Sequence, residues 1–250
     1  MIDLANQIAL VTGGSRGIGR AASLLLARAG ADVALTFHTR ADEADAVARD
    51  IRALSRRAYV GGGDLADPEV VDRLVAGVKR EFGALDMFVA NAGVWPPDEV
   101  RLTEMPMARW RRTLAANLDS VFLSTRAALG LMRPGGRIII VSSTAGQRGE
   151  AFHSDYAATK GALIALTKSL AVEHAPDITV NCVAPGWVDT DMSVPAYTDD
   201  NRERIRRSIP LQRIATAEDI AGPILFLCSP LARHITGEVL NVNGGSVLCG

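Results

Sequence analysis

Residues 12–19 read Thr12-Gly13-Gly14-Ser15-Arg16-Gly17-Ile18-Gly19, a glycine-rich stretch between an apolar segment and a helical one. The apolar segment, Ile8–Thr12 (IALVT), has the composition of a buried strand. The helical segment, Ile18–Ala29, is followed by Gly30, a residue type common just after helices. A strand, a glycine-rich turn and a helix in this order predict a phosphate-binding turn, because helix N-termini offer free N–H groups. A turn without a ligand is the alternative.

The alternation of apolar and helical segments continues along the whole chain. Further strands are predicted at Asp32–Phe37, Ala58–Val60, Met87–Ala90, Arg137–Val141, Thr179–Ala184 and Glu238–Val242. Helices are predicted at Ala41–Leu54, at Met107–Leu129 and at Asp155–Ala175. Two more are predicted to begin at Asp67-Pro68-Glu69, where Asp67 is a candidate N-cap, and at Thr216-Ala217-Glu218-Asp219, a variant of the capping box. This pattern predicts an α/β fold, a Rossmann-type doubly wound parallel sheet of about seven strands. No linker or repeat interrupts it, so residues 1–250 are expected to form a single domain.

Composition narrows the range of partners. The chain has 250 residues, a net charge of −1, 48% hydrophobic residues and 5% aromatic residues. Neither nucleic-acid binding nor a membrane-seeking surface is expected from these values. The three cysteines are far apart and the four histidines are scattered, so no metal site is predicted. No signal peptide and no apolar run of about 20 residues is recognisable. The expected location is therefore the cytoplasm.

A candidate catalytic pair follows the predicted fifth strand. Tyr156 and Lys160 are four residues apart, so both project from one face of a helix. A lysine ammonium is expected to lower the phenol pKa from its usual value of about 10, which would make Tyr156 an acid–base catalyst for a carbonyl oxygen. Ser142 and Ser143 end the preceding strand, and alternation allows only one of them to face the site.

The end of the second strand indicates the choice of nicotinamide cofactor. An acidic residue there would accept from the ribose of NAD(H) and repel a 2′-phosphate. The position holds Phe37, followed by His38, Thr39 and Arg40. Arg16 and Arg40 could pair with a 2′-phosphate, although Arg40 could equally be a free surface residue. NADP(H) is therefore predicted in preference to NAD(H).

Several motifs in a fixed order resemble those of the short-chain dehydrogenase/reductase family. They are the glycine turn with its G-x-x-x-G-x-G spacing, Asn91-Ala92-Gly93, Ser142-Ser143, Tyr156 to Lys160 (Y-x-x-x-K), Pro185-Gly186 and Asn243-Gly244-Gly245. The family carries N-N-A-G where this chain has Ala90 before Asn91. The resemblance implies an oxidoreductase that moves a hydride between the nicotinamide ring and a carbonyl or secondary alcohol carbon.

The resemblance also assigns residues. It selects Ser143 over Ser142 and adds Asn117, as the anchor of a proton-relay water, to a catalytic set completed by Tyr156 and Lys160. Tyr156 and Lys160 are also expected to contact the cofactor, with Lys160 at the nicotinamide ribose. Asp64-Leu65 is expected at the adenine ring. The other cofactor residues predicted from the turn, the second strand and the family motifs are Gly13, Ser15, Arg16, Gly17, Ile18, Gly19, His38, Arg40, Asn91, Ala92, Gly93, Pro185, Gly186, Val188 and Thr190.

Substrate and partners are the least constrained by the sequence. The segments ITVNCVAPGWVDTDM and ITGEVLNVNGG resemble family members that reduce 3-oxoacyl groups on acyl carrier protein. Those relatives tend to place an arginine where this chain has residues 174–177 (HAPD), and Arg126 and Arg133 could compensate in docking an acidic carrier. Alternatives are a ketone, sugar or other secondary-alcohol dehydrogenase, with Trp95 and Trp187 near the mouth, and a non-catalytic dinucleotide sensor. A substrate loop is expected at about 187–210, although the charged residues of this segment could simply form a solvated surface helix. A homotetramer is also expected.

Overall fold

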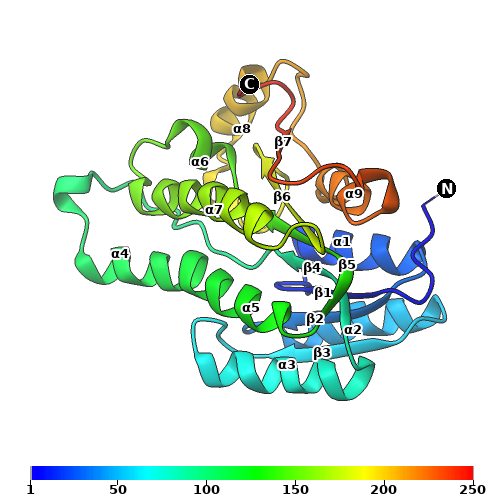
Figure 1. Ribbon diagram of the computed structural model, residues 1–250. Coiled ribbons are helices and arrows are strands. Elements are labelled where there is room, and N and C mark those ends of the chain that lie inside the picture. Colours follow the sequence, from blue (N-terminus) through cyan, green and yellow to red (C-terminus); the bar gives the residue numbers. More distant parts are fainter. Residues whose placement is uncertain (1, 250) are drawn as a thin grey trace.

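A seven-stranded sheet runs through the centre of the molecule in the computed structural model, which describes residues 2–249 (Figure 1). All neighbouring strands are parallel, in the order β3-β2-β1-β4-β5-β6-β7. The strands are β1 (Ile8–Val11), β2 (Asp32–Phe37), β3 (Ala58–Gly62), β4 (Leu85–Ala90), β5 (Met132–Val141), β6 (Ile178–Pro185) and β7 (Val239–Val242). The strand order reverses between β1 and β4, so their carboxyl ends flank the crevice where ligands bind in such sheets.

Helices cover both faces of the sheet (Figure 1). On one face α1 packs against α2 and α9, and on the other α3 packs against α5 and α4 against α7. The helices are α1 (Gly17–Arg28), α2 (Ala41–Ala53), α3 (Pro68–Phe82), α4 (Met107–Leu114), α5 (Ser120–Leu129), α6 (Thr144–Arg148), α7 (Ser154–Glu173), α8 (Asp199–Ser208) and α9 (Ala217–Leu227). The predicted doubly wound parallel sheet is confirmed.

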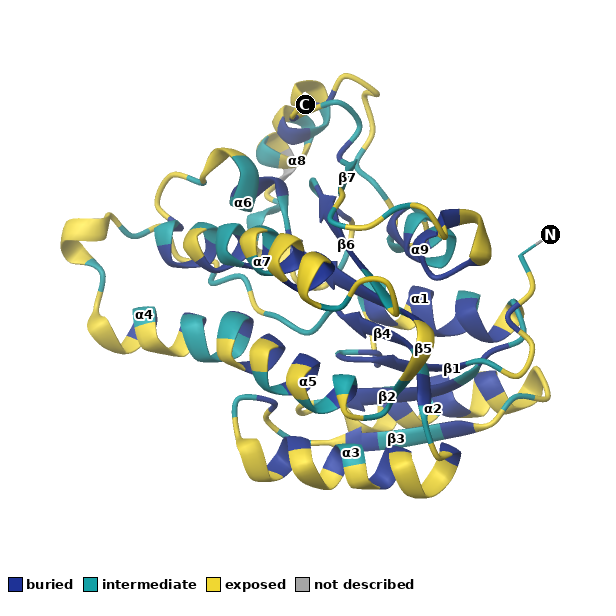
Figure 2. Ribbon diagram, in the orientation of Figure 1, coloured by how far each residue is buried: buried dark blue, intermediate teal, exposed yellow. Residues whose placement is uncertain are grey.

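The strands are apolar at successive positions because both of their faces are buried (Figure 2). Val11 and Val89 belong to the cluster beneath α1, α2 and α9. Their neighbours Leu10 and Phe88 belong to the cluster beneath α3, α5 and α7. Alternating side chains thus fill two separate cores on either side of one sheet.

Local signals placed most element ends within a few residues. Asp67 caps α3 by accepting from the Glu69 N–H at 2.9 Å. Thr216 and Asp219 form the predicted capping box at the start of α9. One expectation needs correction, because the single helix expected at Met107–Leu129 is divided by a π-helical turn at Ala115–Asp119. The segment from Trp187 to Pro210, whose charges could belong to a surface helix, contains α8.

The described part of the chain was also searched for membrane-crossing helices. Between residues 2 and 249, no helix combines the length and the apolar character that crossing a bilayer requires.

Candidate active site

A cavity of about 490 Å³ opens where the strands β1 to β6 end. Most residues predicted for the cofactor and the reaction line it: Gly13, Ser15, Arg16, Gly17, Ile18, His38, Arg40, Asp64, Leu65, Asn91, Ala92, Gly93, Ser143, Tyr156, Lys160, Pro185, Gly186, Val188 and Thr190. Gly19 and Asn117 lie behind the lining rather than in it. Turns that are far apart in the sequence therefore meet at one edge of the sheet.

The glycine turn is held tightly against the end of β4. A Cβ atom on Gly19 would overlap the carbonyl oxygen of Gly13 and lie 2.6 Å from Nδ2 of Asn91. That Nδ2 donates to the Thr12 carbonyl at 3.0 Å and to the Gly13 carbonyl at 3.3 Å. Asn91 thus ties the turn to β4 with its side chain, a contact that the sequence did not indicate. Gly19 serves the close approach of helix and turn.

The N-terminus of α1 is open toward the cavity. Its N-cap, Arg16, is extended and makes no side-chain capping bond, and the first turn holds no acidic residue. Gly17 and Ile18, the first two helical residues, line the cavity. Uncapped N–H groups at the positive end of a helix suit a phosphate group. The turn therefore fits the pyrophosphate of a dinucleotide cofactor.

The part of the cavity at the end of β2 carries one arginine and no carboxylate. Phe37, His38 and Arg40 line this region. Arg40 pairs with Glu43 at 2.9 Å, and both side chains are partly exposed. Asp64 also lines the cavity, and its Oδ1 accepts from the Ala66 N–H at 3.0 Å. The carboxylates here are thus on a neighbouring helix and on the turn after β3.

Arg16, on the glycine turn, reaches toward the segment after β6. Its Nη1 lies 3.2 Å from Oδ2 of Asp191, and both side chains are about half exposed. Asp191 lines the cavity beside Thr190. The ion pair connects the glycine turn to the predicted substrate loop, which the sequence did not indicate.

The predicted catalytic tyrosine is buried in the cavity wall beside Ser143. Burial raises the pKa of Tyr156 to about 12, a hydrogen bond with Ser143 lowers it, and the charge of Glu150 raises it. The phenol is therefore a protonated hydrogen-bond donor at neutral pH. The lowering of this pKa expected from Lys160 is absent in the protein alone, because desolvation outweighs the favourable contacts.

Lys160 is buried behind the tyrosine. Its Nζ donates to the Val141 carbonyl at 3.0 Å and lies 5.7 Å from the Tyr156 ring centroid. Burial lowers the pKa of Lys160 to about 8. Ser142 is buried and anchors α7 by donating to the Lys160 carbonyl at 2.7 Å. Ser143 caps α6 by accepting from the Ala145 N–H at 3.1 Å, and it lies beside the tyrosine.

Asn117 lies in the π-helical turn and is fully buried. Its Oδ1 accepts from the Val94 N–H at 2.7 Å, and its Nδ2 donates to the Val94 carbonyl at 2.9 Å. A Cβ on Gly93 would lie 3.1 Å from Oδ1 of Asn117 and 3.5 Å from Nζ of Lys160. Only the backbone of Gly93 therefore lies between the side chains of Asn117 and Lys160.

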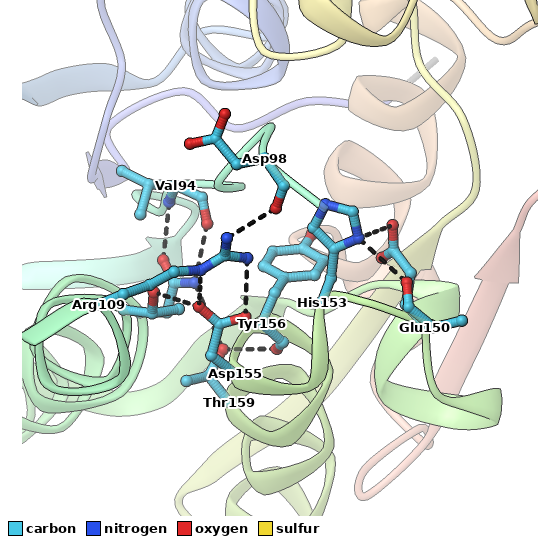
Figure 3. A network of polar contacts seen from close by, with 11 residues as sticks. Val94, Asp98, Arg109, Glu150, His153, Asp155, Tyr156 and Thr159 are labelled. Atoms are coloured by element: carbon cyan, nitrogen blue, oxygen red, sulfur yellow. Dashed lines mark hydrogen bonds and ion pairs between the residues drawn. The ribbon is translucent and has the colours of Figure 1, made fainter. Parts of the chain in front are cut away.

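A buried ion pair, also missed from the sequence, anchors the start of α7 (Figure 3). Nε of Arg109 lies 3.0 Å from Oδ2 of Asp155, the residue directly before Tyr156. Thr113 donates to the same oxygen at 2.9 Å, and Nη1 of Arg109 donates to the Asp98 carbonyl at 2.6 Å. Burial opposes ionisation of Asp155, but the bonds from Arg109 and Thr113 outweigh it and lower the pKa of this carboxyl. The network fixes the helix turn that carries Tyr156.

Aromatic residues surround the mouth of the cavity, as the sequence indicated for Trp95 and Trp187. Their ring centroids are 6.1 Å apart with an interplanar angle of 75°. Trp95 also stacks on His153, with centroids 4.7 Å apart. The turn between Ser143 and Tyr156 adds Arg148 and Glu150 to the lining. The sequence held a signal for these two, since a segment that returns from Ser143 to Tyr156 has to border the site.

The predicted substrate loop contributes its first part to the cavity. Residues 187, 188 and 190–193 line it. The charged helix α8 follows, and its arginines pair with neighbours: Arg202 with Asp189, Arg204 with Asn201, and both Arg206 and Arg207 with Glu203. These charges form a solvated surface helix, which was the simpler of the two interpretations.

A metal centre was searched for over residues 2–249. Within that range no three or more His, Cys, Asp or Glu side chains are grouped so that they could hold a metal ion. The polar groups that line the cavity include the phenol of Tyr156, the hydroxyl of Ser143, the ammonium of Lys160 and the open terminus of α1. This combination can bind a dinucleotide phosphate and hold a carbonyl oxygen, which defines the class of nicotinamide-dependent oxidoreductases.

Comparisons with known proteins agree with this class. A family model described as "Enoyl-(Acyl carrier protein) reductase" matches residues 13–246. The chain belongs to the short-chain dehydrogenase/reductase family. It is an oxidoreductase of carbonyl or alcohol groups that uses a nicotinamide cofactor.

The relatives have different names. A "3-oxoacyl-[acyl-carrier-protein] reductase" from Synechocystis sp. is 39% identical, covering 99% of this chain and 100% of that protein. An "L-rhamnose 1-dehydrogenase (NAD(P)(+))" from Azotobacter vinelandii is 38% identical, covering 97% of each. A short-chain dehydrogenase from Burkholderia cenocepacia, crystallised in complex with NADP, has a TM-score of 0.91 and 40% identity over 97% of this chain and 98% of that one.

We predict that Arg109→Met destabilises the fold by about 3 kcal/mol, because it leaves Asp155 charged and unpaired in the interior. Urea denaturation measures the free energy of unfolding. The matched control is Arg133→Met, which breaks an ion pair to Asp86 whose arginine is 48% exposed. The control should cost less than about 1 kcal/mol. Equal losses in the two variants would contradict the assignment of the Arg109–Asp155 pair as an anchor.

Proposed function

We propose that the chain is an NADP(H)-preferring oxidoreductase of small carbonyl and secondary-alcohol substrates, formed by one domain over residues 1–250 and working in the cytoplasm. The observation that carries the proposal is the burial of Tyr156 beside Ser143 in a cavity that the open α1 terminus also lines. When bound, the nicotinamide cofactor supplies or accepts the hydride.

The roles of the four catalytic residues follow from their places. Tyr156 holds a proton on Oη that it can donate to a substrate oxygen, and Ser143 orients the same oxygen by a hydrogen bond. Lys160, buried with its Nζ near Gly93, would hold the ribose of the cofactor. Asn117 fixes the backbone at Val94, which keeps the Gly93 segment closed over Lys160, and it remains our candidate for a proton-relay anchor.

We predict that Tyr156→Phe lowers kcat by at least about 10²-fold, since the proton donor is removed while the ring packing is kept. Steady-state rates are followed by the absorbance of the reduced cofactor. Tyr59→Phe, on strand β3 and outside the cavity lining, is the matched control and should retain the wild-type rate. Full turnover in Tyr156→Phe would contradict the catalytic assignment.

The preference for NADP(H) rests on Arg16 and Arg40, which both line the cavity, and on the lack of a carboxylate at the end of β2. Their partners are the exposed Asp191 and the partly exposed Glu43, so a 2′-phosphate can replace them at little cost. The remaining contacts would come from the predicted cofactor residues described above.

We predict that Arg16→Ala raises KM for NADPH by about tenfold and changes KM for NADH little, because one charge-assisted contact to the 2′-phosphate is lost. The control is Arg20→Ala, which removes an arginine of α1 that pairs with Asp50 outside the cavity lining. Equal effects of Arg16→Ala on both cofactors would disprove the assignment, and a wild-type preference for NADH would overturn the cofactor proposal itself.

Two substrate classes remain to be separated. Reduction of 3-oxoacyl thioesters, with acyl carrier protein as a partner, is supported by the name of the Synechocystis relative. Of the arginines that could dock a carrier, Arg133 pairs with Asp86 and Arg126 stacks over Phe122 at 5.3 Å. A compact ketone or sugar is supported by the mouth formed by Trp95 and Trp187 and by the rhamnose dehydrogenase relative.

Assays of NADPH oxidation with a 3-oxoacyl thioester and with simple ketones, and of NADP⁺ reduction with sugars, separate the two classes. Activity with the thioester alone supports the carrier-linked reaction.

We also propose a homotetramer assembled through α4, α5, α7 and the C-terminal segment. Phe122 on α5 and Val172 on α7 are 49% and 80% exposed, so a partner chain that packs on these helices would bury apolar surface. We predict a light-scattering mass of about four times the 26.5 kDa of the chain. A mass equal to that of one chain would contradict this proposal.

A further inference from the structure

One carboxylate in the cavity has no part in the reaction described above. Glu150 lies in the turn between α6 and α7, directly after Gly149, whose φ of 77° redirects the chain. Ser143 and Tyr156, at either end of this segment, line the same cavity as Glu150. The carboxylate therefore borders the space in which the reacting oxygen has to lie.

The contacts of Glu150 leave one of its two oxygens free. Nε1 of Trp95 donates to Oε1 at 3.1 Å. Nδ1 of His153 lies 3.6 Å from the same oxygen, and Figure 3 shows this histidine beside Glu150. The stacking of Trp95 on His153, with rings inclined by 20°, holds both partners in place. Among residues 2–249, none donates a hydrogen bond to Oε2. Glu150 is thus a fixed acceptor with unused capacity at the cavity.

The negative charge of Glu150 disfavours the phenolate form of the neighbouring Tyr156. Burial raises the pKa of Glu150, while the Trp95 bond and the charges of His153 and Arg148 lower it. In turn, the Glu150 charge raises the pKa of Tyr156. A glutamine would accept the Trp95 bond equally well without this charge. The Trp95 bond therefore does not by itself require a carboxylate at this position.

The surroundings indicate what the free oxygen accepts. Trp95 and Trp187 line the cavity together with Glu150, and their rings meet edge to face. Aromatic faces pack against C–H surfaces, and a carboxylate oxygen accepts from hydroxyl groups, so together they suit a polyhydroxylated molecule. A 3-oxoacyl thioester has no O–H or N–H donor next to its reacting carbonyl and would leave Oε2 unpaired.

We propose that Glu150 accepts a hydrogen bond from a substrate hydroxyl on the carbon next to the reacting one, and that the site selects polyhydroxylated small molecules. The inference rests on the proposed function, because it requires Tyr156 and Ser143 to hold the reacting oxygen. Glu150 is then a specificity-determining residue that discriminates substrates by one hydroxyl group.

The test compares cyclohexane-1,2-diol with cyclohexanol, which differ by one neighbouring hydroxyl, in oxidation by NADP⁺. We expect the wild-type enzyme to favour the diol by at least about tenfold in kcat/KM, because a charged acceptor discriminates strongly for its donor. Glu150→Gln should lose about tenfold for the diol, mainly through KM, and Glu150→Leu should remove the preference. Glu104→Gln, an exposed carboxylate outside the cavity lining, should leave both rates unchanged.

Titration of tryptophan fluorescence with the two alcohols gives a second readout that does not require turnover, and thermal melting verifies that the variants are folded. Stronger binding of the diol to the wild type than to Glu150→Leu supports the proposal. Equal handling of the two alcohols, a preference that survives in Glu150→Leu, turnover of the thioester alone, or neither turnover nor binding of the diol overturns it. If Tyr156→Phe abolishes turnover while the Glu150 variants keep the preference, only this inference fails and the proposed function stands.

Discussion

Parallel pairing of the strands is the constraint on which the rest of this structure depends. It places the carboxyl ends of β1, β4, β5 and β6 on one edge, so that turns far apart in the sequence form one cavity. Antiparallel pairing of any one of these strands would carry its turn to the opposite edge. Parallel pairing also requires helices on both faces, and this explains why Leu10 and Val11 are equally apolar although they point in opposite directions.

The fold was predictable where short-range signals decide it. The Asp67 cap and the Thr216 capping box depend on residues two or three positions away, and both were predicted. The start of β5 was not, because residues 132–136 (MRPGG) have the composition of a turn. They join the sheet through pairing with β4 and β6, for example between Gly136 and Ile178. The π-helical turn likewise depends on contacts between Asn117 and the distant Val94.

The sequence predicted which residues form the site better than it predicted their pKa values. Motif spacing placed Ser143, Tyr156 and Lys160 together, and the structure brings them to one cavity. From the sequence, the charge of Lys160 was expected to lower the pKa of the Tyr156 phenol. In the structure, burial raises the pKa of Tyr156 and lowers that of Lys160. Both shifts have one cause, since an interior without water disfavours either charged form. The burial of a side chain depends on packing from many segments, so the spacing of a motif does not predict it.

Substrate choice lies in the segments between the motifs. Relatives of nearly equal identity are named as a carrier-protein reductase and a sugar dehydrogenase, so a shared fold and a shared tyrosine leave the substrate open. Because Ser143 and Tyr156 both line the cavity, the turn that joins them has to border it. This requirement does not fix which residue types the turn contains. Glu150 occupies such a position, and Trp95 fixes it from another segment. The fold that forms the cavity is therefore shared with these relatives, while the group that we propose to recognise the substrate lies in a turn whose composition the fold leaves free.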